Sequence, residues 1–346
     1  MTQKAKIAIV ILNWNGEKLF PDFLPSIIKN SPGEQVEIIV ADNGSSDNSL
    51  QFLTDNFPTV TILDLETNYG FAKGYNVALA KIEADYFVLV NSDVKVTKNW
   101  LEPCIKRFEE DDKTVAIQPK ILSYNEPELF EYAGAAGGFI DKFGYPFCRG
   151  RILNQVETDE NQYDQSSEIF WASGACMFIR ADAFKNTGGF DADFWAHMEE
   201  IDLCWRLKNQ GYKIVYEPKS VVYHLGGGTL SYGSPRKIYL NFRNNLFMMY
   251  KNLPKNQFKR TFTVRMILDG VAAVKFIAGF DFREFWAVVK AHWAFYRNFT
   301  SLRKKRRDIQ KQVIKKEHTE VYSKSIMWKF FLQKKRKFSE LNYNPD

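Results

Sequence analysis

The chain has 346 residues and a formal net charge of +6 at neutral pH, and 45% of its residues are hydrophobic and 15% aromatic. Such a chain can bury a sizeable core in one large domain or two, which excludes a disordered protein. Its four cysteines lie far apart and form no Cys-x-x-Cys pair. This spacing favours neither a zinc ribbon nor a disulfide framework, so we expect reduced thiols in a cytoplasmic protein.

The N-terminal segment places lysines before a short apolar run, residues 7–12, and no small-residue cleavage site follows it. We therefore interpret the run as a first β-strand rather than a signal peptide. The longest nearly apolar stretch, residues 262–280, contains Arg265, Asp269 and Lys275. These charges disfavour a membrane span but leave open a helix that lies on a membrane.

Up to about residue 96, short apolar runs typical of buried strands alternate with segments of helical periodicity. This alternation predicts βαβ units and a mainly parallel sheet covered on both faces. The predicted strands are residues 6–12, 36–42, 60–65 and 86–93, and the predicted helices are residues 17–30, 49–57 and 74–82.

Polar side chains follow three of the predicted strands, at Asn13, at Asp42 with Asn43, and at Asn91 to Asp93. Asn, Ser and Asp also start ordinary turns by bonding their own backbone, so each position alone has a plain structural explanation. Because ligands bind at the carboxyl ends of strands in α/β sheets, the three ends together predict a pocket at one edge.

The chain is less regular from residue 101 to 163, and its many glycines predict a loop-rich insertion over this pocket. An apolar run at residues 169–184 and an amphipathic helix from Glu199 to a C-terminal glycine, Gly211, follow it. Beyond Ser234 the patterns become helical, aromatic and basic, with 15 lysines and arginines against three acidic residues between positions 297 and 337. We therefore divide the chain into a first domain, residues 1–233, and a helical basic extension, residues 234–346.

The segment around residues 68–76 carries Asn68, Gly70, Gly74 and Asn76 at the start of a predicted helix. Free backbone N–H groups at such a start favour a phosphate. Glycines that merely allow close packing are an equally good reading of this pattern.

Seven pieces of the chain, in this order, resemble family 2 glycosyltransferases of the GT-A fold, close to the rhamnosyltransferase-like branch. The match runs from Ile7 to Thr229, while the C-terminal third matches only loosely. The pieces are "IVILNWNG", "VADNGSSDNS", "NYGFAKGYN", "VNSDV", "SGACMFIR", "GGFDADFWAHMEEIDLCWRLKNQGYKI" and "YHLGGGT".

This resemblance implies an α/β, Rossmann-like nucleotide-diphospho-sugar transferase fold with a helical C-terminal extension. It implies an inverting glycosyltransferase that moves a sugar from a nucleotide-diphosphate sugar to a hydroxyl of a glycan or lipid-linked sugar. The expected setting is cell-surface polysaccharide or glycolipid biosynthesis at the cytoplasmic face of the membrane.

The resemblance also implies that Asp93 binds Mg²⁺ or Mn²⁺ bridging the two donor phosphates, and that His224 contacts the metal or the diphosphate. Oxygen ligands suit such hard cations, and the metal neutralises the departing diphosphate. Asn91 stands where the family motif has its first Asp, so this chain offers one carboxylate there rather than two.

Three acids open the predicted helix at Glu199, Glu200 and Asp202. Acids at a helix start also complement its dipole, and positions three apart share a face, so Glu199 and Asp202 should project together. By resemblance the general base corresponds to Glu200, a Glu where the family has an Asp, and Glu199 remains the alternative.

The resemblance and the polar strand ends together define the positions that we expect to contact substrate. Asp42 should contact the nucleoside, and Trp171 and Trp195 would stack on sugar faces or pack in the core. The full predicted set is Asn13, Asp42, Asn43, Asn68, Gly70, Lys73, Asn76, Ser92, Trp171, Gly174 and Asp202.

Two other classes of function compete with a transferase. A nucleotidyltransferase would need a glycine-rich loop after the first strand, where only Gly16 stands, and "GAAGGF" lacks the spacing of a dinucleotide site. A non-enzymatic polybasic membrane-binding protein would explain the tail but not the strand-end carboxylates, and the charge pattern does not favour nucleic acid. We expect peripheral membrane contact through residues 282–299 and the basic tail.

Overall fold

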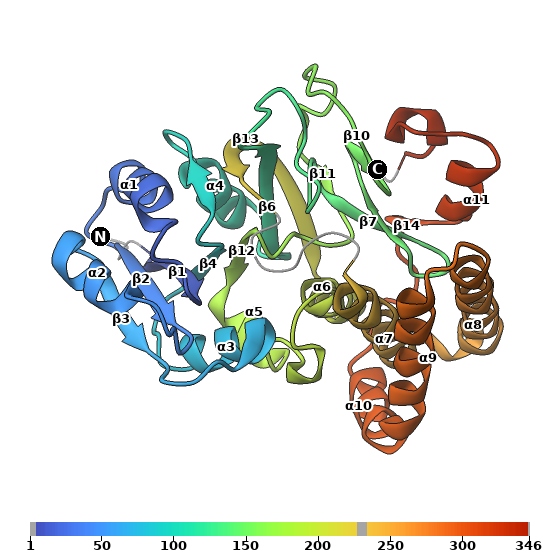
Figure 1. The fold of residues 1–346 in the computed structure, drawn as a ribbon. Helices are drawn as coiled ribbons and strands as arrows, with labels where there is room; N and C mark the ends of the chain where they lie inside the picture. The colour runs from blue at the N-terminus through green and yellow to red at the C-terminus, as the bar shows by residue number, and fades with distance from the viewer. Residues whose placement is uncertain (1–4, 227–233, 345–346) are drawn as a thin grey trace.

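A computed structural model of the protein describes residues 5–226 and 234–344 (Figure 1). Residues 227–229, the end of the last family-like piece, lie outside the described residues. The chain forms a central sheet with helices on both faces, a smaller second sheet, and a group of long C-terminal helices. The predicted α/β class and the helical C-terminal region are thus confirmed.

The first third of the chain alternates strands and helices, as its periodicity predicts up to residue 96. Residues 102–123, which we expected to be irregular, continue the alternation with a helix and a ten-residue strand. β1 and β4 are buried along almost their whole length, as expected for strands covered on both faces. The elements are β1 (Ile7–Asn13), α1 (Phe20–Asn30), β2 (Val36–Asp42), α2 (Ser49–Asn56), β3 (Thr61–Asp64), α3 (Gly70–Leu79), β4 (Tyr86–Val90), β5 (Val94–Val96), α4 (Glu102–Glu110) and β6 (Thr114–Ser123).

The central sheet has the strand order β11-β13-β6-β12-β4-β1-β2-β3, and β5 pairs with the end of β13. β3, β2, β1 and β4 are parallel, as are β6 and β13, while β12 is antiparallel to both of its neighbours. The elements of this second half are β11 (Ser167–Glu168), β12 (Cys176–Arg180), α5 (Ala181–Asn186), α6 (Glu199–Asn209) and β13 (Lys213–His224).

The two faces of this sheet carry separate hydrophobic clusters. Alternate residues of β1 point to opposite faces, as the period of a strand requires. Ile9 and Ile11 belong to the cluster that contains Phe20 of α1, whereas Ala8 and Val10 join the cluster of α3 and α6. This burial on both sides fixes the strands that carry the polar residues at the sheet edge.

Four short strands in the later part of the predicted loop-rich insertion and one strand from the C-terminal region form a second sheet with the order β10-β9-β8-β7-β14. Its strands are only two to four residues long, which is too short for a periodic pattern to reveal. The last strand comes from the C-terminal region and pairs in parallel with β7. These strands are β7 (Gly138–Asp141), β8 (Pro146–Cys148), β9 (Arg151–Ile152), β10 (Gln155–Val156) and β14 (Val321–Tyr322).

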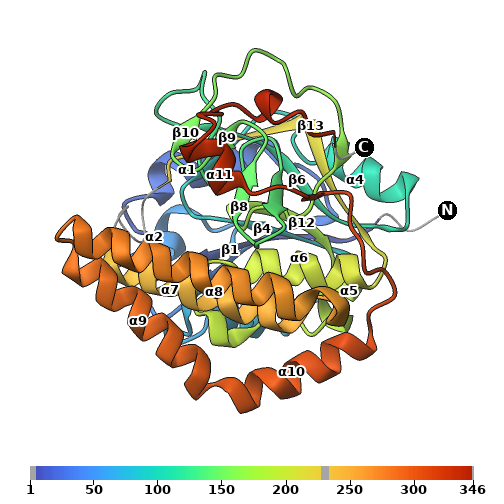
Figure 2. The ribbon, with the colours of Figure 1, turned by 90° about the vertical axis from the view of Figure 1, so that its right-hand side faces the viewer.

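The C-terminal third is helical and contacts both sheets. α8 and α9 lie side by side across the edge of the molecule and pack on α7 (Figure 2). No helix of the described ranges is long and apolar enough to cross a membrane. The helices are α7 (Pro235–Asn252), α8 (Lys255–Ala278), α9 (Phe282–Arg297), α10 (Phe299–Lys311) and α11 (Ile326–Phe331).

The basic tail folds back onto the insertion. Phe338 is buried against Phe139 and Phe147 of the second sheet, with ring centroids 5.3 and 6.1 Å away. Its backbone N–H donates to Glu157 at 2.9 Å. The tail is therefore part of the packed structure, although many of its lysines remain exposed.

Candidate active site

The polar residues predicted to line one edge lie at the ends of neighbouring strands. Asn13 is paired in register with Asp42, and Val90 at the end of β4 is paired with Ile11. Asn91 and the residues after it therefore continue beyond the same edge as Asn13. The sheet brings the first two predicted clusters together.

Asp42 is fully buried, and its neighbours at the strand ends hold it in place. Asn13 Nδ2 donates to Asp42 Oδ1 at 2.8 Å, and the Ser45 hydroxyl donates to the same oxygen at 2.6 Å. The backbone N–H of Ser45 donates to the second oxygen at 2.9 Å. Both carboxylate oxygens accept hydrogen bonds from the loop that follows β2, so the carboxylate orders this loop.

Asn43 connects the end of β2 to the start of α3. Its amide donates to Asn68 Oδ1 and to the carbonyl of Gly70, both at 3.2 Å, and its carbonyl accepts from Tyr69. Gly70 has a φ of +74°, and a Cβ there would lie 2.7 Å from the ring of Trp195. Only glycine allows this approach.

The start of α3 does not leave free N–H groups for a phosphate. The carbonyl of Trp195 accepts from the N–H groups of Phe71 and Ala72, at 2.8 and 3.2 Å. The side chain of Asn76 is bonded at both ends to the backbone of Phe190, at 2.7 and 2.9 Å. Lys73 is exposed and lies over a tyrosine ring. The packing explanation of these glycines and asparagines fits the hydrogen bonds better than the phosphate explanation does.

Asp93 and His224 meet directly beyond the ends of β4 and β13. His224 Nε2 lies 3.1 Å from Asp93 Oδ1, and Nδ1 lies 3.3 Å from Glu131 Oε2. Gly226 has a φ of +70°, and a Cβ there would stand 2.9 Å from Glu131 Oε1. The imidazole is thus held between two buried carboxylates, and a glycine makes room for the second one.

These contacts change the protonation of both partners. Burial alone would raise the pKa of the Asp93 carboxyl, but the hydrogen bond and charge of His224 lower that pKa below its usual value. Burial disfavours a charged His224, yet Glu131 and Asp93 outweigh burial and raise the pKa of the imidazole to about 10. The two acidic side chains thus favour the protonated imidazole.

The chemistry of this pair fits a divalent metal. A carboxylate oxygen and an imidazole nitrogen converge within 3.1 Å, and both are ligands that Mn²⁺ accepts. Within residues 5–226 and 234–344, however, no group of three His, Cys, Asp or Glu side chains is arranged to hold a metal by itself. A metal held by Asp93 and His224 would therefore need donor phosphates or water as further ligands.

Glu199 and Glu200 open α6, and no lysine, arginine or histidine within residues 5–226 and 234–344 forms a salt bridge with either carboxylate. One carboxylate oxygen of each is buried and has no hydrogen-bond partner. Burial raises the pKa of Glu200 to about 7. Burial, and then the charge of Glu200, raise the pKa of Glu199 well above its usual value. A carboxyl that titrates near neutral pH can accept a proton, which is the property of a general base.

The loop before α6 has a strained backbone. Trp195, His197 and Met198 all have φ between +64° and +71°, although none of them is glycine. Asn244 of α7 holds this loop, since its Nδ2 donates to the carbonyls of Phe194, Ala196 and His197 at 3.0, 2.8 and 2.7 Å. Such strain persists only where surrounding contacts impose it, and it concentrates at functional sites.

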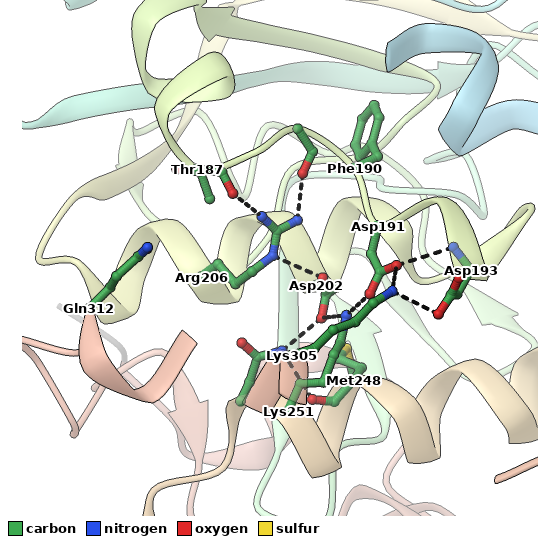
Figure 3. Close-up of polar contacts among 12 residues, drawn as sticks. Thr187, Phe190, Asp191, Asp193, Asp202, Arg206, Met248, Lys251, Lys305 and Gln312 are labelled. Carbon is green, nitrogen blue, oxygen red and sulfur yellow. Dashed lines mark hydrogen bonds and ion pairs between the residues drawn. The ribbon is translucent and has the colours of Figure 1, made fainter. Parts of the chain in front are cut away.

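Asp202, which we expected to project together with Glu199, is fully buried. Figure 3 shows it in a buried ion cluster, where Arg206 donates to it at 3.0 Å and Lys251 lies 3.0 Å away. Lys251 also pairs with Asp191, which Lys305 of α10 contacts as well. The face of α6 that carries Asp202 thus turns toward α7.

Of the remaining predicted positions, Ser92 and Gly174 lie beside strand ends of this edge, and Trp171 lies against the second sheet. Ser92 is half-buried in the turn between β4 and β5, and Gly174 precedes β12 and faces Phe71. Trp171 is buried, and its indole N–H donates to the carbonyl of Phe139 at 2.9 Å. Trp171 is therefore a core residue in this structure.

Two residues of the site escaped the sequence analysis. Glu131 lies in the irregular segment, where no sequence pattern distinguishes it from the other acidic residues of the chain. Asn244 lies on a helix beyond the matched region and acts through the loop that it holds. Both become visible only when segments about 50 to 90 residues apart are brought together.

Comparisons with known proteins show the family and the fold. The model of glycosyl transferase family 2 matches residues 8–188, slightly more than half of the chain. An N-acetylglucosaminyl-diphospho-decaprenol L-rhamnosyltransferase of Mycobacterium tuberculosis (strain CDC 1551 / Oshkosh) is 26% identical over 207 residues, which cover 55% of this chain and 66% of that relative. Rhamnosyltransferase WbbL of Escherichia coli (strain K12) is 25% identical over 220 residues, covering 61% of this chain and 80% of that relative.

A crystal structure of GalNAc-T7 with UDP, GalNAc and Mn²⁺ shares the fold with a TM-score of 0.58 and 17% sequence identity. The similarity covers 72% of this chain and 48% of that one. The chain therefore spans about two thirds of the mycobacterial relative and about half of this structure. The predicted GT-A fold and the resemblance to the rhamnosyltransferase-like branch are confirmed.

Proposed function

This chain belongs to glycosyl transferase family 2, and from that membership we propose that it transfers a sugar from a nucleotide-diphosphate sugar to an acceptor hydroxyl. The observation that carries the proposal is the carboxyl of half-buried Glu200, which has one buried oxygen without a hydrogen-bond partner and a pKa near 7. Burying a carboxylate oxygen without a neighbouring cation destabilises the folded state. A role in proton transfer explains why such a group is present.

We propose a single displacement with inversion at the anomeric carbon. Glu200 takes the proton of the acceptor hydroxyl, whose oxygen attacks the anomeric carbon from the side opposite the diphosphate. The C–O bond to the diphosphate breaks as the new glycosidic bond forms, and no covalent enzyme intermediate is needed. Glu199 is the alternative base, since it too has an unpaired oxygen.

Asp93 and His224 would hold Mg²⁺ or Mn²⁺. When bound, such an ion would neutralise charge on the departing diphosphate. His224 must give up its proton to serve as a ligand, and its position between Asp93 and Glu131 offers that proton an acceptor. The solved relative with UDP and Mn²⁺ supports this assignment by analogy.

The donor side is assigned to the ends of β1 and β2, where Asp42 orders the loop that would meet a nucleoside. The names of the two rhamnosyltransferase relatives support a deoxyhexose or hexose donor and a glycan or lipid-linked acceptor. We place the reaction in cell-surface polysaccharide or glycolipid biosynthesis at the cytoplasmic face of a membrane. Residues 1–233 would carry the catalysis, and residues 234–346 would hold its loops.

A screen of the purified protein against nucleotide-diphosphate sugars, measuring release of the nucleoside diphosphate, tests this function. One or a few donors should give release that depends on Mg²⁺ or Mn²⁺ and is lost in Asp93→Ala. An anomeric coupling in the NMR spectrum of the product then reports the stereochemistry. No release from any donor, or a retained anomeric configuration, would contradict the proposal.

A further inference from the structure

Helix α9 is apolar on two opposite sides. One side is buried on α7, where Ala291 is fully enclosed and the ring of Phe295 lies 6.5 Å from that of Phe247. The other side presents Trp286 and Trp293, which are 55% and 63% exposed. These tryptophans are two turns apart and so share one face. A surface helix of a soluble protein normally carries polar residues there.

Helix α8 continues the same surface. Ile267, Val271, Val274 and Ile277 recur at spacings of four, three and three, which places them on one side of the helix. All four are exposed. α8 and α9 lie side by side (Figure 2). On each helix the exposed stripe lies on the side away from the buried residues, which include Ala273 of α8 and Ala291 of α9.

The turn between these helices and a later helix extend the surface further. Phe280, at the turn, is 81% exposed, and Phe282 beside it is also exposed. Trp328 and Phe331 of α11 are exposed as well, and Lys275 of α8 lies 5.1 Å above the Phe331 ring. α11 therefore borders the C-terminal part of α8.

We call the exposed hydrophobic side chains of residues 267–299 and 328–332 the apolar face. This face holds 14 of the 18 large hydrophobic side chains that are exposed on the described residues. Scattered exposed hydrophobic residues are normal, but a contiguous group marks a surface that binds something.

Positive charge surrounds the apolar face. Lys275, Arg283, Lys290 and Arg297 are exposed along α8 and α9, whereas Asp281 is the exposed acid of this stretch. Where the start of α8 faces α10, a cleft of about 1510 Å³ is lined by seven lysines and arginines and by no acidic residue. A ligand for this surface must be apolar at its centre and anionic at its edge.

We propose that the apolar face rests on the surface of an anionic lipid bilayer. Its tryptophan and phenylalanine rings would enter the boundary between headgroups and acyl chains, and the surrounding lysines and arginines would contact lipid phosphates. A second copy of the chain fits less well, because a two-fold contact would bring the same basic rims together.

The proposal extends the predicted membrane contact, which rested on the basic tail, to a defined apolar surface. It stands apart from the proposed activity, since vesicle binding is measured without donor or acceptor. If the proposed activity is correct, this orientation on the membrane also brings the active site close to lipid-linked acceptors. α9 packs on α7, and Asn244 of α7 holds the loop before Glu199. A lipid-linked acceptor would then arrive one helix layer from the catalytic carboxylates.

Co-sedimentation of the full-length protein with lipid vesicles tests the proposal. The vesicles are phosphatidylcholine alone or phosphatidylcholine mixed with phosphatidylglycerol. The double variant Trp286→Ser/Trp293→Ser should bind the mixed vesicles about tenfold more weakly or worse, because it removes two interfacial anchors. The double variant Arg303→Gln/Lys304→Gln changes two exposed residues of the basic cleft. It should weaken binding to mixed vesicles at low salt and leave binding to neutral vesicles unchanged.

Ile314→Ser is the matched control, because Ile314 is 81% exposed but lies outside the apolar face. It should bind like the wild type, and circular dichroism should show the same melting temperature for all variants. Binding of the tryptophan variant within twofold of the wild type would overturn the proposal, as would a wild type that binds neither vesicle. Light scattering tests whether the apolar face instead binds a second copy of the chain. A wild-type protein that binds no vesicles, and forms a dimer that dissociates in the tryptophan variant, would overturn the proposal.

Discussion

Replacing Asn244 by alanine should reduce turnover without weakening donor binding. The two N–H protons of its amide are shared by three carbonyls of the loop before α6. Each net hydrogen bond contributes about 0.5–1.5 kcal/mol, and a buried group left unpaired costs about 1–3 kcal/mol. We therefore expect a loss of about 2–4 kcal/mol in the free energy of unfolding.

The same substitution removes the contacts that keep the loop strained, and strain energy released on relaxation offsets part of this loss of stability. Each residue in an unfavourable backbone region stores about 1–3 kcal/mol, and this loop has three of them, Trp195, His197 and Met198. Once the amide is gone, the loop can relax and move the start of α6. A displacement of about 1 Å at a reacting group costs about 100-fold in rate, so kcat should fall by about tenfold to 100-fold.

The neighbouring Asn245 supplies a matched control. Its amide donates to the carbonyl of Gly144 at 2.6 Å in the insertion, far from the strained loop in sequence, and its carbonyl accepts from buried Arg265. Asn245→Ala should lower the melting temperature to a similar extent but keep kcat. Steady-state kinetics at a temperature well below both melting transitions makes the comparison. Equal kcat values in the two variants would refute a positioning role for Asn244.

Further predictions concern the carboxylates and the ion cluster. Glu200→Gln should lower turnover by about 100-fold or more, while calorimetry should show unchanged donor binding. If Glu199→Gln shows these effects and Glu200→Gln does not, the general base is Glu199. The kcat/KM of the wild type should rise as pH rises through about 7, because burial raises the pKa of Glu200 to about 7 and only the ionised form accepts a proton; a flat profile would contradict this. Burial raises the pKa of Glu199, so the folded state holds that proton more tightly than the unfolded state and stability is lost as pH rises. Glu199→Gln should therefore raise the melting temperature more at pH 8 than at pH 5, and an equal shift at both would exclude this cause. Lys251→Met leaves Asp191 and Asp202 short of a cation and should cost about 3–5 kcal/mol in urea denaturation, whereas a loss below about 1 kcal/mol would mean that the remaining cations suffice.

The sheet edge was predictable because its signals are local. An apolar run such as residues 86–90 that ends on Asn91 to Asp93 predicts both a buried strand and a polar strand end. The order of strands and helices then places these ends together without any knowledge of distant contacts. Asp42 and Asp93 were both located in this way.

The roles of other predicted residues depend on contacts that no local pattern contains. Asp202 follows the i, i+3 rule with Glu199, but Arg206 of α6 and Lys251 of α7 hold it in a buried ion cluster. The start of α3 has the glycines of an anion site, yet the carbonyl of Trp195 occupies its donors. Helix geometry determines the direction in which such side chains project. Contacts with other parts of the fold determine whether they remain available to bind a ligand.

The second sheet can be completed only after β14 has been synthesised, because β14 pairs with β7. Glu157 and Phe338, which are bonded to each other, stand 181 residues apart in the sequence. During synthesis the N-terminal strands β1 to β4 can associate early, while β7 keeps an unpaired edge until residues beyond 320 have left the ribosome. Contacts between such distant residues form slowly. A chain cut near Asn298 would keep that edge open permanently, and an open strand edge is a template for aggregation.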